Sequence, residues 1–156
     1  MTATHVRPAE LADIPKLIAL MTEFYAEAGF ALPAAPAERT FERLLGEARL
    51  GRVWILECDA QPAGYVVLTV GFSMEYGGLR GFVDDLFVRL PSRRRGLGAA
   101  ALDEVRRTCA AWGVRALLVE VGPSNETAQR LYRRSGFEDS GRLLLTLPLA
   151  APLHVA

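Results

Sequence analysis

Three consecutive arginines followed by two glycines form the stretch of this chain that is best suited to binding an anion. Arg93, Arg94 and Arg95 precede Gly96 and Gly98 in the segment RRRGLG. Glycine lets the backbone approach a ligand closely, because no Cβ stands in the way. A helix that starts here adds unpaired amide groups and the positive end of its dipole. Together with the arginine charges, these groups predict a phosphate or pyrophosphate site.

Two adjacent carboxylates, Asp84 and Asp85, interrupt an apolar segment that is typical of a strand at 82–88. A carboxylate in such surroundings is costly unless it is paired or hydrated, so the pair favours a functional role. Neighbouring strand residues point to opposite faces, so both acids face one cleft only if the strand bulges. For proton transfer, Asp84 is the first choice of general base, with Asp85 and Glu120 behind it.

Several folds place a glycine-rich turn between a strand and a helix. A Walker loop requires Gly-Lys-Ser/Thr, which does not follow Gly98. The dinucleotide fingerprint fits in part, because Gly96, Gly98 and Ala101 match Gly-x-Gly-x-x-Ala and Glu120 follows about 20 residues on. However, the remaining chain is too short for the further βαβ units, and the preceding strands have an antiparallel pattern. An NAD(P)-binding oxidoreductase is therefore the least favoured alternative.

A third family matches more of the sequence. Arg93-x-x-Gly96-x-Gly98 resembles the Arg/Gln-x-x-Gly-x-Gly/Ala signature of the GNAT superfamily of N-acetyltransferases. Asn125 and LYRRSGF at 131–137 are similar to that family's Asn…Ala…Leu-Tyr-x-x-x-Gly-Phe pattern. The resemblance implies acetyl-coenzyme A as co-substrate, held where two strands splay apart. The implied contacts are Leu86, Phe87, Val88, Arg93, Arg94, Arg95, Gly96, Leu97, Gly98, Ala99, Asn125 and Tyr132.

The same resemblance assigns chemical roles. Tyr132 occupies the tyrosine of the pattern and is expected to protonate the leaving thiolate. The segment VDDLFV is similar to a strand of polyamine (diamine) acetyltransferases, in which the first acid is the proposed base. Here that acid is Asp84, one methylene shorter, which favours a relay through water. The expected acceptor is a primary amine, small and cationic, that attacks the thioester directly, and Glu23, Glu27 and Asp85 would contact its charge. A peptide acceptor stays open, as does a coenzyme A-binding regulatory domain without turnover.

Hydrophobic periodicity predicts one mixed α/β (α+β) domain over residues 1–156, with the order β-α-α-β-β-β-α-β-α-β. The 82–88 and 116–121 strands should be parallel, because a helix connects them. The predicted helices lie at 13–28, 37–48, 96–112 and 125–135. The predicted strands lie at 5–7, 53–58, 63–72, 82–88, 116–121 and 142–147.

Composition limits the partners. The 156 residues carry 18 basic and 18 acidic side chains, and no long basic run supports nucleic-acid binding. No signal peptide is evident, and no stretch approaches the roughly 18 apolar residues of a membrane span. Cys58 and Cys109 lack metal-ligand spacing, which favours free thiols in the cytoplasm and no metal site. The uncharged tail at 148–156 is expected to cover a sheet edge or to meet a second subunit in a homodimer.

Overall fold

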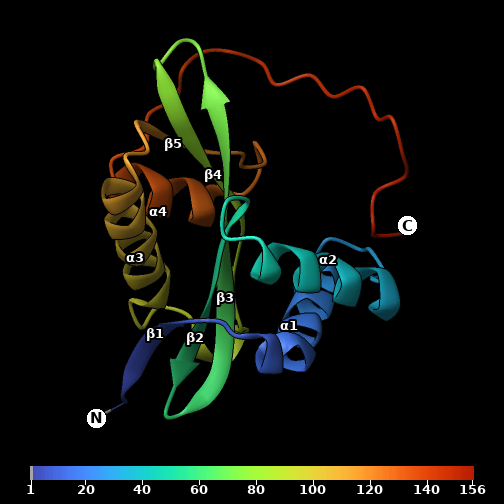
Figure 1. The fold of residues 1–156 in the computed structure, drawn as a ribbon. Coiled ribbons are helices and arrows are strands. Elements are labelled where there is room, and N and C mark those ends of the chain that lie inside the picture. The colour runs from blue at the N-terminus through green and yellow to red at the C-terminus, as the bar shows by residue number, and fades with distance from the viewer. Residues whose placement is uncertain (1) are drawn as a thin grey trace.

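The computed structural model describes residues 2–156 and shows a five-stranded sheet with helices on both faces (Figure 1). The strands lie side by side in chain order. They are β1 (Thr4–Pro8), β2 (Gly51–Cys58), β3 (Gln61–Ser73), β4 (Gly78–Val88) and β5 (Ala116–Val119). The first four are antiparallel to their neighbours, and β5 is parallel to β4. The predicted fold class and the predicted parallel pair are confirmed.

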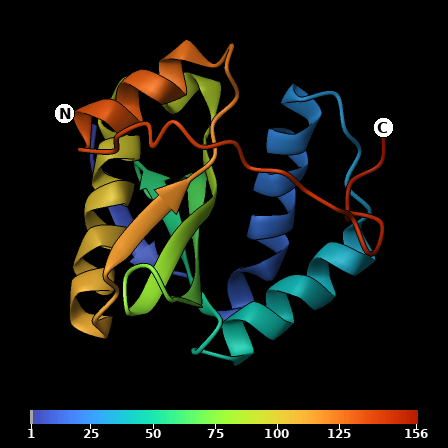
Figure 2. The ribbon, with the colours of Figure 1, turned by 90° about the horizontal axis from the view of Figure 1, so that it is seen from above.

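Two layers of helix enclose the sheet, as the view from above shows (Figure 2). On one face lie α1 (Ile14–Glu27) and α2 (Ala34–Gly46), and on the other lie α3 (Leu97–Trp112) and α4 (Glu126–Arg134). Each face of the sheet therefore has its own apolar core. Within residues 2–156, no helix has both the length and the apolar content required to cross a membrane.

Local sequence explains most boundaries. Asp59 and Ala60 both have positive φ angles, of 51° and 61°, so they form the tight two-residue turn that joins β2 to β3. Gly96 and Gly113 adopt left-handed conformations at the two ends of α3. The second helix begins at Ala34, earlier than predicted, because Pro36 is tolerated in the first helical turn.

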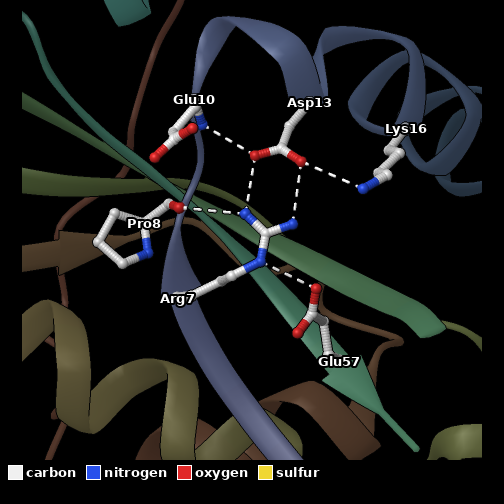
Figure 3. A network of polar contacts seen from close by, with 6 residues as sticks. All are labelled: Arg7, Pro8, Glu10, Asp13, Lys16 and Glu57. Atoms are coloured by element: carbon white, nitrogen blue, oxygen red, sulfur yellow. Dashed lines mark hydrogen bonds and ion pairs between the residues drawn. The ribbon is translucent and has the colours of Figure 1, made fainter. Parts of the chain in front are cut away.

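A buried carboxylate fixes the start of α1 to the sheet (Figure 3). Arg7 donates hydrogen bonds of 2.8 and 2.9 Å to Asp13, and a third of 2.9 Å to Glu57 of β2. These contacts hold the pKa of Asp13 well below its usual range. A lowered pKa means that Asp13 stabilises the fold at neutral pH, and that this contribution is lost as the pH falls through the folded-state pKa. Asp13 thus joins the start of α1 to the sheet: it stands at the N-cap position of α1, but its side chain makes no capping hydrogen bond to that helix.

The last predicted strand, at 142–147, is absent from the part of the chain that the structure describes. After α4 the chain leaves the body as an extended segment, here called the arm (residues 138–156), which crosses from the α4 side to the α1–α2 side (Figures 1 and 2). The prediction was wrong because a strand exists only where a neighbour pairs with it. The apolar run LLLTL has strand-forming residues, but no strand within residues 2–156 pairs with it.

Candidate active site

The two parallel strands separate in the middle of the molecule. Pairing between β4 and β5 runs from Arg80 opposite Ala116 to Val83 opposite Val119, and β5 then ends. Because β4 continues to Val88, alternate N–H and C=O groups beyond Val83 face away from β3 without a strand partner within residues 2–156. The edge of β4 beyond Val83 is therefore open on the side where the family resemblance implied that the two strands splay apart. Glu120 lies just past the end of β5, on the exposed surface.

A β-bulge brings the two aspartates to the same face. In the β3–β4 register, Val67 lies opposite Asp85 and Leu68 lies opposite Val83, so Asp84 is the extra residue. Val83 and Leu86 both pack into the core under α3 and α4. The two aspartates between them consequently face α1 and α2, which meets the condition that the sequence had set for a shared cleft.

Asp85 is the more enclosed of the two acids. The hydroxyl of Tyr65 donates a 2.7 Å hydrogen bond to Asp85 Oδ2, and Tyr65 itself is fully buried. Burial, with a smaller effect of the Asp84 charge, raises the pKa of Asp85 to about 7, although the bond from Tyr65 opposes this rise. Asp84 is exposed to solvent, and its partial desolvation raises its pKa too. A carboxylate with a pKa near neutrality is suited to accept a proton at physiological pH.

Three tyrosines surround this acidic pair. Tyr132, on the inner face of α4, is only 8% exposed, and its ring meets Phe137 edge to face at 5.5 Å. Burial, and then the charge of Asp85, raises the pKa of Tyr132 to about 12. Tyr25 of α1 has a pKa raised to about 12 by burial and by both aspartates. The phenol of Tyr132 is therefore protonated at neutral pH and acts as a hydrogen-bond donor.

Sequence reasoning missed Tyr25 and Tyr65. Both sit at positions that apolar periodicity assigns to the core, and neither belongs to a motif. One signal was available for Tyr65. It pairs across the strands with Phe87, whose side chain shares a face with Asp85, so an in-register β3–β4 pairing places the phenol diagonal to that acid.

The turn before α3 exposes a set of main-chain donors. It contains the short helix η2 (Leu90–Ser92), then Arg94 at φ +62° and Gly96 at φ +80°. Among residues 2–156, the amides of Arg94, Arg95 and Gly96 donate to no other backbone group. The amides in the first turn of α3 have no partner within the helix either. Successive free amides at a helix N-terminus form an anion site, so the geometry fits a pyrophosphate.

The arginines of this turn have more than one role. The guanidinium of Arg93 donates to the Val88 carbonyl at 2.7 Å and pairs with Glu27 at 2.6 and 2.9 Å. Arg89 pairs with Glu23 at 2.7 and 2.9 Å. Glu23 and Glu27, expected at the acceptor amine, thus link α1 to the turn, and only Asp85 of the three expected contacts lies among the tyrosines.

Two further motif residues shape α4. A Cβ atom on Gly98 would lie 2.9 Å from Leu131 Cδ2, so glycine permits α3 and α4 to approach closely. Asn125 caps α4, since its Oδ1 accepts a 3.2 Å hydrogen bond from the amide of Ala128. Leu97 is buried beneath the turn, whereas Ala99 is exposed beside it.

Gly96→Ala is expected to weaken coenzyme A binding about tenfold. An alanine at φ +80° is strained by about 1–2 kcal/mol, so the unliganded turn relaxes and binding must restore it. Calorimetric titration with coenzyme A measures the change. Gly77→Ala is the matched control, because Gly77 has φ +66° and equally open surroundings but lies in the β3–β4 turn. Equal affinities of the two variants would contradict this placement of the pyrophosphate.

Comparison with known proteins decides the family. The sequence model of the acetyltransferase (GNAT) family matches residues 17–137. This chain belongs to that family. It is an acetyl-coenzyme A-dependent N-acetyltransferase, and the amide-rich turn beside the separated strands suits its co-substrate. Among residues 2–156 of this GNAT enzyme, no group of three or more His, Cys, Asp or Glu is arranged to hold a metal ion.

Three known proteins similar to this GNAT chain illustrate the match. The L-methionine sulfoximine/L-methionine sulfone acetyltransferase of Pseudomonas paraeruginosa is 25% identical over 141 residues, which are 88% of this chain and 82% of that protein. The integron cassette protein HFX_CASS3, from the mobile metagenome of Cole Harbour Salt Marsh, is 55% identical with a TM-score of 0.88, over 95% of this chain and 92% of that one. Aminoglycoside N-acetyltransferase AAC(6')-Iy, in complex with CoA, shares the fold with a TM-score of 0.83 at 16% identity, over 96% and 97%.

Proposed function

We propose that this enzyme transfers the acetyl group of acetyl-coenzyme A to a primary amine of a small cationic molecule by direct attack. The observation that carries the proposal is the bulge in β4, which turns Asp84 and Asp85 toward one face. One carboxylate is enough to remove one proton, so the second is available to bind a positive charge on the acceptor. A positively charged acceptor is the ligand that such a pair favours.

The two acids differ in burial, which supports different roles in the reaction. An alkyl ammonium has a pKa near 10, so the enzyme must remove a proton before the nitrogen attacks. Asp85, enclosed and with a pKa of about 7, accepts this proton. Asp84, which is more exposed to solvent, faces the remaining positive charge of the acceptor. Sequence reasoning had assigned these two roles the other way round, with Glu120 in reserve.

The remaining groups complete the transfer. Acetyl-coenzyme A supplies an acyl group activated as a thioester. The N–H groups of β4 near Leu86 and Phe87 that do not face β3 donate to the thioester oxygen as negative charge develops there. Tyr132 passes the proton of its hydroxyl to the departing sulfur, and the second proton that the nitrogen loses as the amide forms restores the phenol. The turn at 93–99 and Asn125 hold the coenzyme, and Val88 lines its path between the strands.

The size of the acceptor follows from the enclosed position of Asp85 and from the names of the relatives. Asp85 accepts a hydrogen bond from Tyr65, and its charge raises the pKa values of Tyr25 and Tyr132, so we infer that only a slender amine reaches this enclosed acid. The named relatives are acetyltransferases of an amino-acid analogue and of aminoglycosides, both small amines. Within this range we place a diamine first, because one amine can react while the second meets Asp84.

Release of free thiol from acetyl-coenzyme A tests the proposal across diamines, amino acids including methionine sulfoximine, aminoglycosides and peptides. Putrescine is compared with butylamine, which has the same length but lacks the second charge. A preference of roughly tenfold or more for the diamine in kcat/KM, equivalent to about 1.4 kcal/mol, is expected. Preference for a peptide would reject a small acceptor. Coenzyme binding without thiol release for any amine would instead support the regulatory-domain alternative.

A further inference from the structure

The hydroxyl of Tyr65 lies in the core and has a single partner. The residue is 0% exposed, and its hydroxyl donates to Asp85 Oδ2 at 2.7 Å. Among residues 2–156, this hydroxyl makes no second hydrogen bond. A phenol is costly to bury unless its hydroxyl is paired, and phenylalanine would fill nearly the same space without that cost. The hydroxyl therefore serves Asp85 and not the packing of the core.

Three aromatic rings hold the ring of Tyr65 in place. Phe24 of α1 and Phe41 of α2 meet it edge to face, with centroids 6.3 and 6.5 Å away. Phe87 of β4 packs beside it at 6.4 Å. A side chain packed on several sides has few alternative rotamers. The hydroxyl thus stays at one point, and Asp85 forms the hydrogen bond only in its present orientation.

The bulge in β4 brings Asp85 to this phenol. Beyond the bulge, Asp85 lies opposite Val67, so it shares a face of the sheet with Tyr65, two residues away on β3. If the register before the bulge continued, Asp85 would lie opposite Val66, which packs into the core on the other face. One extra residue in β4 therefore decides whether the acid and the phenol meet.

The second carboxylate oxygen of Asp85 is free and accessible. Within residues 2–156, Oδ1 accepts no hydrogen bond. No buried side-chain oxygen in that part of the chain lacks a partner, so Oδ1 reaches the accessible surface. Tyr65 thus occupies one oxygen and leaves the other open. An oxygen in this position can take a proton from a ligand while the phenol still donates to Oδ2.

We propose that Tyr65 is the residue that positions Asp85 for proton transfer. The phenol holds Oδ2 while an N–H bond of the amine breaks, an O–H bond forms at Oδ1, and the electron pair stays on the nitrogen for attack. Without the phenol, the carboxylate can rotate about its side-chain bonds, and Oδ1 loses its fixed direction. Because Tyr65 is fully buried, it acts through Asp85. This inference rests on the proposed function, in which Asp85 is the base.

The hydrogen bond also favours the ionised form of the acid. Burial and the charge of Asp85 raise the pKa of Tyr65 far above its usual range, so the phenol remains a donor at every assay pH. Loss of this donor therefore raises the pKa of Asp85 above about 7. The other titratable neighbours are Asp84 on β4, Tyr25 on α1 and Tyr132 on α4. Helix α2 packs apolar side chains against the cluster.

Tyr65→Phe tests the proposal, because it removes the hydroxyl and keeps the ring. The acidic limb of the kcat profile, followed by thiol release, is expected to move about one pH unit higher. KM for acetyl-coenzyme A should stay the same. A substitution that only loosened the core would lower activity without moving the limb, and thermal unfolding of the variant measures any such loosening.

Titration of the Asp85 carboxyl carbon by NMR measures its pKa without any acceptor. In Tyr65→Phe this pKa should rise by about one unit, and Asp85→Asn identifies the resonance. Tyr25→Phe is the matched control. The charge of Asp85 raises the pKa of Tyr25, yet among residues 2–156 Tyr25 donates no hydrogen bond to that acid, so its loss should shift the titration much less. In wild type, the hydroxyl proton of Tyr65 should give a resonance that shifts as Asp85 titrates.

Each outcome decides a separate claim. An unchanged Asp85 pKa in Tyr65→Phe, or a wild-type hydroxyl resonance that ignores the titration, would overturn the inference. Equal shifts in Tyr65→Phe and Tyr25→Phe would overturn it too, since the effect would not depend on the hydrogen bond. If the carbon titration shifts as expected while Asp85→Asn keeps its acidic limb, the proposed base is wrong, whereas the hold of Tyr65 on Asp85 stands.

Discussion

Tyr132→Phe is expected to lower kcat by about 10²- to 10³-fold, while the affinity for acetyl-coenzyme A stays nearly the same. The substitution removes only the hydroxyl and keeps the ring against Phe137. Because the pKa of Tyr132 is raised to about 12, the wild-type phenol carries its proton throughout the usual assay range. The loss should therefore be equally large at every pH in that range. Thiol release at saturating substrates measures kcat.

Tyr76→Phe provides the control, since Tyr76 lies in the exposed β3–β4 turn and its loss should change kcat little. A Tyr132→Phe enzyme with kcat within a few-fold of wild type would show that the phenol only packs and that another group protonates the thiolate. No turnover in wild type for any amine, together with unchanged acetyl-coenzyme A binding in Tyr132→Phe, would instead point to the regulatory alternative.

Asp85→Asn is expected to remove most activity and also to stabilise the fold. Asparagine can still accept the hydrogen bond from Tyr65 but cannot take a proton from the amine. In wild type, activity should rise with pH to a plateau above about 7, since Asp85 must be ionised to act as the base. The variant should lose kcat by about 10²-fold or more and should lack this acidic limb.

The stability change follows from the same pKa. A carboxyl whose pKa is raised from 3.8 to about 7 binds its proton more tightly in the folded chain, so stability falls as the pH rises through this interval. Replacing it should raise the free energy of unfolding at neutral pH by roughly 1 to 3 kcal/mol, allowing for its partial exposure. Urea denaturation at two pH values measures this. Asp103→Asn, an exposed change on α3, should alter neither property, and a wild-type pH profile in Asp85→Asn would reject Asp85 as the base.

The parts of the site that local sequence determines were predictable. The turn at Gly96 lies between a strand and a helix because glycine and helix-start preferences act over a few residues. From the sequence, Asp84 and Asp85 could be expected to share a face only if the strand bulges. The bulge itself could not be predicted, because it depends on the register with β3. The ion pair between Glu23 and Arg89 joins residues that are 66 positions apart, so the spacing of residues within α1 cannot predict it.

The absence of the last predicted strand could not be foreseen for a related reason. Residues 142–147 have the composition of a buried strand, yet Leu143, Leu145 and Leu147 are exposed in the structure. Composition does not report where a partner lies, because pairing is a property of two segments. Tyr65 was missed in the same way. Its apolar neighbours correctly place it in the core, but only tertiary contact reveals that its hydroxyl meets Asp85.

The two ion pairs that join α1 to the turn before α3 limit how this protein can be redesigned. Glu23 and Glu27 lie on α1, which faces the proposed amine site, and their carboxylates pair with Arg89 and Arg93 beside the turn proposed to hold the pyrophosphate. A change made at either glutamate to retune acceptor choice therefore loosens the grip on the coenzyme as well. Selectivity is more safely engineered at Tyr25, which faces the two aspartates and has no such second attachment to the turn.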